Sequence, residues 1–190
     1  MTLNDLILKI KVFEGFRKNV YIDSGGTPTI GYGRTNIKSM DETTTKEKED
    51  KWLAEKVSAV YENVRQKMLA WGYYSLSTDQ ILALTDFTYN LGIKNLNQLT
   101  DNGKRDISTI AEKIPLYDKC KGKELYGLTK RRQWEYDLFV SGTKHLTKAE
   151  KLQIKINEMY KHFEVDKQIK VDGIVGNETI SACIDIFNLL

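Results

Sequence analysis

Hydrophobic residues in the N-terminal segment recur at intervals of three and four, which is the spacing of one face of an α-helix. The residues that share this face are Leu3, Leu6, Ile7, Ile10 and Phe13. The pattern therefore predicts an amphipathic helix that ends near Glu14 and Gly15, where the periodicity stops.

The segment that follows, residues 20–35, has a different character. It is rich in Gly, Thr, Tyr and Ser, and its strand-forming residues lie between turn signals such as Ser24-Gly25-Gly26 and Thr27-Pro28. Such punctuation is typical of short antiparallel strands. We therefore expect a small β-hairpin or meander here.

From residue 44 the helical pattern returns, and two segments begin with the residue types of a capping box, Thr44-x-x-Glu47 and Ser77-x-x-Gln80. The second segment is apolar on most of its faces, so it is predicted to be the buried central helix. Gly92 suits the position just past its end.

Two further helices are predicted, one over residues 106–114 that stops at Pro115 and one over residues 128–140 that closes at Gly142. The order is thus one helix, a small β element and then several helices. This order predicts an α+β fold that is predominantly α.

A break at residues 141–143 precedes a second helical region. Thr147-x-x-Glu150 opens one helix, and a final helix carries apolar residues on one side, namely Ile180, Cys183, Ile184 and Phe187. We predict two domains, residues 1–142 and a small helical module at 145–190. At about 46 residues the module is marginal as an independent fold, so an alternative is that it packs against the first domain for stability.

Composition and charge restrict the partners. The net charge is +3, and residues 143–190 hold seven Lys and seven acids, so the excess lies in the first domain. This bias suits an anionic partner such as a cell wall, but it is too weak to imply nucleic acid. No metal or phosphate-binding motif is apparent, so no cofactor is expected. Cys120 and Cys183 are far apart and are expected to be free thiols.

The location of the protein is also constrained. No stretch approaches the ~20 apolar residues of a membrane span, so no stable membrane insertion is expected. The first residues carry an acid where a signal peptide would be basic. We therefore expect a soluble protein made in the cytoplasm with no export route of its own.

Two acids near the N-terminus could carry chemistry. Glycoside hydrolysis needs one carboxyl group that donates a proton and a second that stays ionised. Glu14 follows an apolar stripe, Asp23 lies in a polar turn, and Thr29 lies six residues further on, where its hydroxyl could orient a water. Among 26 acids, however, such a pair also arises by chance, so solvated surface acids remain an alternative.

The residues around this pair extend the pattern. Residues 14–35 read EGFRKNVYIDSGGTPTIGYGRT, residues 86–92 read DFTYNLG, and residues 127–142 read GLTKRRQWEYDLFVSG. These three blocks, in this order, resemble the active-site segment, central helix and closing helix of the phage-type lysozymes. That family includes the endolysin of phage T4 and those of the P22 group. The resemblance covers residues 1–142 and implies a lysozyme-like fold.

The resemblance implies a role for each matching residue. Glu14 matches the general acid, Asp23 the acid that activates water, and Thr29 the threonine beside that water. Together they imply inverting hydrolysis of the β-1,4 bond between N-acetylmuramic acid and N-acetylglucosamine in peptidoglycan. Arg131 matches an arginine that pairs with the catalytic glutamate.

Four further residues match positions that face the substrate in this family: Tyr32, Thr35, Tyr89 and Asn90. Sugar contact and simple packing remain alternatives for them. The resemblance also implies an endolysin that acts as a monomer and waits in the host cytoplasm until a holin opens the membrane.

The C-terminal module resembles small peptidoglycan-binding domains. The match lies in Leu152-Gln153-x-x-x-Asn157 and in the stretch VDGIVGNETI at 171–180. The alternative is an extension that only covers apolar surface. For the whole chain, the alternatives to a muramidase are a non-catalytic wall-binding or virion structural protein, and a lytic transglycosylase. Membrane disruption by an amphipathic helix fits poorly, because the C-terminal helices are short and near neutral.

Overall fold

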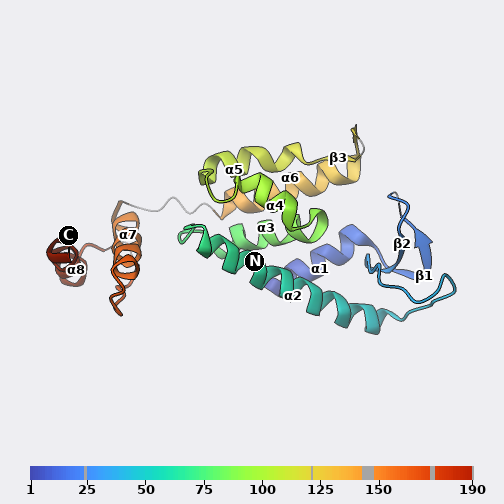
Figure 1. The fold of residues 1–190 in the computed structure, drawn as a ribbon, viewed down its shortest axis with the longest axis horizontal. Helices are drawn as coiled ribbons and strands as arrows, with labels where there is room; N and C mark the ends of the chain where they lie inside the picture. Colours follow the sequence, from blue (N-terminus) through green and yellow to red (C-terminus); the bar gives the residue numbers. More distant parts are fainter. Residues whose placement is uncertain (24, 121, 143–147, 172–173, 190) are drawn as a thin grey trace. The chain divides into compact units, whose positions relative to one another are not determined.

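The computed structural model describes residues 1–190 except 24, 121, 143–147, 172–173 and 190, and it omits the side chains at 120, 148 and 151. The chain divides into two compact units, Met1–Gly142 and Thr143–Leu190. Each unit contains hydrophobic core residues of its own. Figure 1 traces the chain through both units.

The first unit consists of helices and two small antiparallel sheets, which confirms an α+β fold that is predominantly α. Its elements in chain order are α1 (Leu3–Glu14), β1 (Arg17–Ile22), β2 (Pro28–Gly31), α2 (Lys46–Ala70), α3 (Thr78–Leu91), α4 (Ile93–Thr100), α5 (Ile107–Lys113), a 3₁₀ helix (Ile114–Leu116), β3 (Lys119–Cys120), β4 (Lys123–Glu124) and α6 (Tyr126–Ser141).

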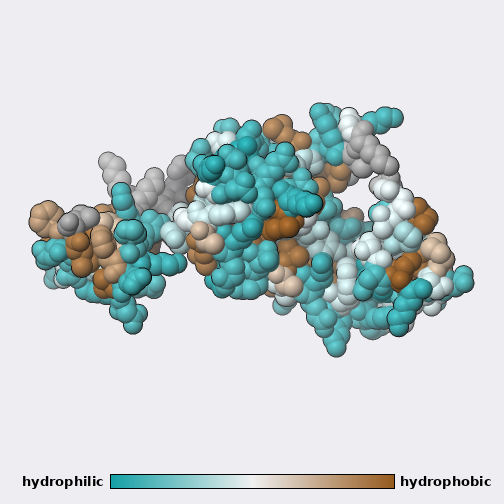
Figure 2. Space-filling model, viewed as in Figure 1, coloured by the Kyte–Doolittle hydropathy of each residue, from teal (hydrophilic) through white to brown (hydrophobic). Residues whose placement is uncertain are grey.

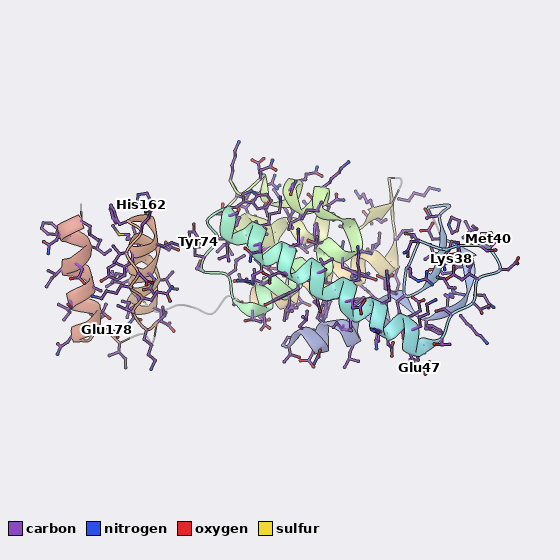
Figure 3. All side chains as sticks on the ribbon, turned by 60° about the horizontal axis from the view of Figure 1, so that its bottom comes forward. Lys38, Met40, Glu47, Tyr74, His162 and Glu178 are labelled. Atoms are coloured by element: carbon purple, nitrogen blue, oxygen red, sulfur yellow. The ribbon has the colours of Figure 1, made fainter. Side chains whose placement is uncertain are left out.

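The sheet β1–β2 lies at one end of this unit, and the long helix α2 runs from that end toward the cluster of α3 to α6 (Figure 1). In Figure 3, Glu47 marks the start of α2 near the loop that carries Lys38 and Met40, and Tyr74 lies past its other end. The helix thus links the two parts of the unit.

Helix α3 is the central helix, as its sequence predicts. Ser77 and Gln80 form the expected capping box, and Gly92 ends the helix with a φ of 84°. Every residue from Gln80 to Thr88 is buried. The reason is that α3 packs against both α2 and α6 and contributes to two hydrophobic clusters, one through Leu82 and the other through residues such as Phe87.

The start of α2 differs from the prediction by one residue. Thr45, not Thr44, is the N-cap, and its side chain accepts a hydrogen bond from the Lys48 backbone. Thr44 is buried and donates its hydroxyl to Glu49 Oε1 at 2.6 Å. The predicted Thr44–Glu47 box is therefore wrong, because the hydroxyl of Thr44 is used by the carboxylate of Glu49.

Other boundaries agree with the sequence more closely. Gly15 is the C-cap of α1, Asp106 is the N-cap of α5, and Gly142 is the C-cap of α6. The chain passes through Pro115 as a 3₁₀ turn rather than stopping before it. Helix α4 and the β3–β4 hairpin had no counterpart in the sequence prediction.

The second unit contains α7 (Lys148–His162) and α8 (Asn177–Leu189). Its buried hydrophobic residues are Ile156, Tyr160, Ile169, Ala182 and Ile186. Polar side chains join its segments: Asn157 exchanges two hydrogen bonds with the backbone of Ile169, and Gln153 donates to the carbonyl of Ile174. The predicted turn at 172–176 and the predicted cap at Thr147 lie partly or wholly outside the described residues.

Helix α8 does not bury most of the apolar residues that its sequence places on one side. Thr179, Ala182 and Ile186 are buried, whereas Ile180, Ile184 and Phe187 are exposed. Figure 2 shows hydrophobic residues at the surface of this unit. Cys183 is a free, half-buried thiol, and the side chain of Cys120 lies outside the described part. None of the helices among the described residues combines the length and hydrophobicity that crossing a bilayer requires.

Candidate active site

A cleft of about 900 Å³ lies in the first unit, between the β1–β2 hairpin with its following loop and the helices α1, α2 and α3. Its lining residues are Glu14, Arg17, Tyr21, Ile22, Asp23, Thr29, Gly33, Thr35, Asn36, Trp52, Lys56, Tyr89 and Asn90. The structure thus brings together six of the predicted residues: Glu14, Asp23, Thr29, Thr35, Tyr89 and Asn90.

Glu14 is the last residue of α1, and its carboxylate is held from α6. Arg131 Nη1 donates to Glu14 Oε1 at 2.7 Å. The other edge of the same guanidinium is fixed by Asp86 of α3, which accepts from Nε and Nη2, each at 2.9 Å. Asp86 and Arg131 are buried, whereas 22% of the Glu14 side chain is exposed. Glu14 is therefore anchored on one oxygen and open toward the cleft.

The charge of Arg131 is secured by this arrangement. Burial lowers the pKa of a guanidinium, because it penalises the charged form. The carboxylates of Asp86 and Glu14 outweigh this effect, so the pKa of Arg131 is raised above its ordinary value. Arg131 thus stays a cation that donates to both carboxylates.

Asp23 lies just after β1 in the hairpin turn. Its Oδ1 accepts hydrogen bonds from the backbone N–H groups of Gly25 at 2.8 Å and Thr27 at 2.7 Å. These bonds fix the carboxylate on one oxygen, and within the described part of the chain no donor is bonded to Oδ2. Asp23 can therefore accept a proton from a molecule in the cleft.

Thr29 pairs with Tyr21 across the hairpin and lies on the strand that returns from the turn. Its hydroxyl donates to the backbone carbonyl of Thr27 at 3.0 Å. Because that bond uses its only proton, the oxygen is left as an acceptor. It can accept a hydrogen bond from a water in the cleft.

A glycine is required beside Glu14. Gly33 has a φ of +99°, which side chains other than hydrogen rarely tolerate. A Cβ at this position would lie 3.7 Å from Glu14 Oε2 and 3.8 Å from the Tyr89 hydroxyl. The backbone at Gly33 therefore forms part of the wall of the cleft next to the acid.

The loop beyond β2 is fixed to α2 by a buried ion pair. Arg34 donates to the fully buried Glu49, with Nη2 at 3.0 Å from Oε1, and also to Glu42 at 2.7 Å. Gly31 makes room for this carboxylate, because a Cβ there would lie 2.4 Å from Glu49 Oε2. These contacts hold in place the loop that carries Thr35 and Asn36.

Tyr32, a predicted substrate contact, is not among the described residues that line the cleft. Its side chain is only 2% exposed and packs against Phe16, with ring centroids 5.6 Å apart. Burial raises the pKa of Tyr32 to about 12. Of the two alternatives for this side chain, its burial favours packing over contact with the substrate. Its backbone carbonyl instead accepts a hydrogen bond from the Tyr89 hydroxyl at 2.9 Å.

Several cleft residues were missed in the sequence. Trp52 and Lys56 lie four positions apart on α2, a spacing that puts them on one helix face and would have identified them as a pair. Asp86 stands at the start of the DFTYNLG block but received no role there. No pattern in the sequence identified Arg17 or Asn36 as cleft residues. No group of three or more His, Cys, Asp or Glu in the described ranges is arranged to hold a metal ion.

Comparison with known proteins identifies the class. Residues 11–135 match the family described as Phage lysozyme, and the chain belongs to this family. It is 29% identical over 171 residues to the endolysin of Bacillus phage PZA, a match that covers 85% of this chain and 64% of that protein. The chain thus spans slightly less than two-thirds of the length of that relative.

Two solved structures are similar to the chain. The endolysin of Escherichia coli O157:H7 phage FAHEc1 is 29% identical, with a TM-score of 0.58 over 74% of this chain and 94% of that one. The muramidase domain of SpmX from Asticaccaulis excentricus is 26% identical, with a TM-score of 0.59 over 72% of this chain and 95% of that one. Both similarities extend over nearly the whole of the neighbour.

Proposed function

We propose that the chain is an endolysin that hydrolyses the β-1,4 bond between N-acetylmuramic acid and N-acetylglucosamine in bacterial peptidoglycan. The observation that carries this proposal is one cleft containing two carboxyl groups in different surroundings. Glu14 is held by a buried arginine, and Asp23 is held by backbone amides in an exposed turn. Membership of the phage lysozyme family supports the same conclusion.

In the proposed reaction, Glu14 donates a proton to the glycosidic oxygen as the C–O bond breaks. A water molecule attacks the anomeric carbon from the opposite face, and Asp23 accepts the proton that the water loses. The Thr29 hydroxyl oxygen accepts the other hydrogen of that water and orients it. This sequence inverts the anomeric configuration and requires about 6.5–9.5 Å between the two carboxyl groups.

Arg131 has a supporting part in this reaction. Its bond to Oε1 leaves Oε2 of Glu14 to carry the proton that is donated. Thr35, Tyr89 and Asn90 are proposed to contact the glycan, since each lines the cleft. The proposed chemistry needs only these side chains and water.

The second unit is proposed to bind peptidoglycan. It has a core of its own, and the alignment with the PZA endolysin covers 85% of the chain, which is more than the first unit alone. A linked binding site would raise the effective concentration of the wall at the catalytic cleft. The alternative is that residues 145–190 only cover apolar surface.

The setting follows from the proposed activity. The protein is proposed to act as a monomer on the wall, without a nucleic-acid partner and without stable insertion into the membrane. As an endolysin it would be made in the host cytoplasm and reach the wall after a holin opens the inner membrane.

Digestion of purified peptidoglycan tests the proposal. We expect the chain to clear a wall suspension and to release fragments with reducing muramic acid ends, as found by mass spectrometry and reducing-end analysis. Glu14→Gln should abolish clearing, whereas Glu112→Gln, a change at an exposed position on α5, should not. A 1,6-anhydro product would instead identify a lytic transglycosylase. Equal clearing by Glu14→Gln and the parent would show that catalysis is not the cause.

A further inference from the structure

Helix α6 presents two consecutive arginines, and each of them contacts a different cleft residue. Arg131 donates to Glu14, and Arg132 Nη2 donates to Asn90 Oδ1 at 3.0 Å. Arg132 Nη2 also donates to Glu135 one turn further along the same helix. Asn90 lies at the end of α3 and lines the cleft, whereas Arg132 is completely buried behind it.

The hydrogen-bonding capacity of the buried Arg132 guanidinium is only partly satisfied by the fold. Its Nε and Nη1 atoms are buried and have no hydrogen-bond partner within the described part of the chain. A buried guanidinium with unpaired N–H groups is unfavourable, and an apolar side chain of similar size is often at least as stable in such a position. Burial lowers the pKa of Arg132, which reflects the same penalty. The one nitrogen that is used, Nη2, is the one that reaches Asn90.

The contact determines which way the Asn90 amide faces. A guanidinium has donors only, so the atom of Asn90 that meets Arg132 must be the oxygen. The amide nitrogen Nδ2 is thereby directed away from Arg132. It makes no hydrogen bond with any described residue, and Asn90 is half-buried in the wall of the cleft. Asn90 thus lines the cleft with an amide nitrogen available to donate, while its oxygen already accepts one hydrogen bond from Arg132.

We propose that Arg132, braced by Glu135, is a positioning residue that fixes Asn90 so that Nδ2 donates to a carbonyl oxygen of the bound glycan strand. This inference rests on the proposed function and adds a recognition rule to it. A sugar hydroxyl can accept or donate, so it would not need a fixed amide, whereas a carbonyl is only an acceptor. Peptidoglycan offers such oxygens in its acetamido groups and in its stem peptides.

Binding experiments on the full chain with Glu14→Gln test the rule without depending on cleavage. Asn90→Asp keeps the oxygen that Arg132 contacts and replaces the amide nitrogen, the proposed donor to the glycan, with an acceptor. Its fold should therefore persist, while its affinity for the correct ligand should fall about tenfold. The probes are tetra-N-acetyl-chitotetraose, its de-N-acetylated counterpart, and a peptide-bearing muropeptide fragment.

The pattern of losses identifies the source of the carbonyl. If an acetamido group is recognised, the parent should prefer the acetylated tetramer about tenfold, and Asn90→Asp should lose that preference. If a stem peptide is recognised, only the muropeptide should bind more weakly to Asn90→Asp. Unchanged binding of all probes by a folded Asn90→Asp protein would overturn the proposal.

The role of Arg132 is tested by a double-mutant cycle. Arg132→Lys keeps the positive charge beside Glu135 but lacks the planar fork that serves both partners. It should weaken binding in the Asn90-containing protein and have no further effect when Asn90→Ala is already present. Additive losses would show that Arg132 does not act through Asn90. The parent could show the expected binding pattern with these probes and still release no fragments from peptidoglycan. That result would contradict the proposed hydrolysis but support this inference.

Discussion

At the scale of single residues, the buried Asp86 is the side chain on which the geometry of the candidate acid depends most. Arg131 could reach Glu14 in many orientations if only that contact held it. The two bonds from Nε and Nη2 to Asp86 define the plane of the guanidinium and so the position of Nη1. Bidentate pairs of this kind are geometrically specific.

Asp86→Asn therefore tests whether Arg131 must be held rigidly. The amide removes the charge and one of the two acceptors while keeping the shape. We expect kcat on peptidoglycan to fall on the order of tenfold with KM nearly unchanged, and stability to fall by about 1–3 kcal/mol. Kinetics and denaturant unfolding measure the two effects. Asp137→Asn, an exposed change on α6, is the control. An unaltered kcat would mean that the clamp is dispensable.

The buried Glu135 leads to a prediction about how the stability of the fold depends on pH. Burial raises the pKa of Glu135 well above its ordinary value, and the nearby Asp86 adds to the effect. Between the ordinary and the raised pKa, the folded state keeps a proton that the unfolded chain has released. The folded state then binds more protons, so stability falls as the pH rises through this window.

Glu135→Gln removes this titration while keeping an oxygen that accepts from Arg132. Relative to the parent, the variant should become progressively more stable from about pH 4 upward, toward the raised pKa. Thermal unfolding of both proteins across this range measures the difference. A constant difference would show that Glu135 does not retain its proton. Glu112→Gln, at an exposed position, should show no such trend.

At the scale of elements, the start of α2 offers a direct comparison of neighbouring threonines. Thr45 caps the helix, so Thr45→Ala should cost about 1 kcal/mol. Thr44 satisfies the buried carboxylate of Glu49, so Thr44→Val leaves that oxygen with one donor fewer and should cost about 1–3 kcal/mol. Denaturant unfolding ranks the two. No loss for Thr45→Ala would instead favour the boundary inferred from sequence, in which Thr44 is the cap.

These threonines also show what sequence can predict. The predicted capping box of Ser77 and Gln80 and the predicted helix end at Gly92 were correct, because both depend only on residues next to the helix end. The Thr44 assignment failed because its hydroxyl is used by Glu49, whose burial depends on Arg34 and on the space at Gly31. Local pattern could not reveal that contact.

The final helix illustrates the same limit. Helix α8 is apolar on more than one side, so its sequence does not determine which side is buried. The buried side is selected by α7, where Gln153 donates to Thr179 at 3.2 Å. In the cleft, Glu14, Asp23 and Thr29 were found by resemblance, whereas the contact between Asp86 and Arg131 joins residues 45 positions apart and needed the fold.

At the scale of the whole molecule, the two units have separate cores. The clusters around α3 draw only on residues of the first unit, and the cluster of α7 and α8 only on the second. We therefore expect residues 1–142 to fold when expressed alone, with a cooperative thermal transition.

This separation gives the sharpest test of the second unit, in which residues 1–142 are compared with the full chain on two substrates. On soluble peptidoglycan fragments the two should have the same kcat/KM, because the cleft is complete in the first unit. On insoluble walls at low enzyme concentration, the shortened protein should be slower by roughly tenfold or more, since a tethered binding site acts through effective concentration. Equal rates on both substrates, with both proteins folded, would instead favour a unit that only covers apolar surface. A loss on soluble fragments as well would mean that the second unit supports the cleft itself.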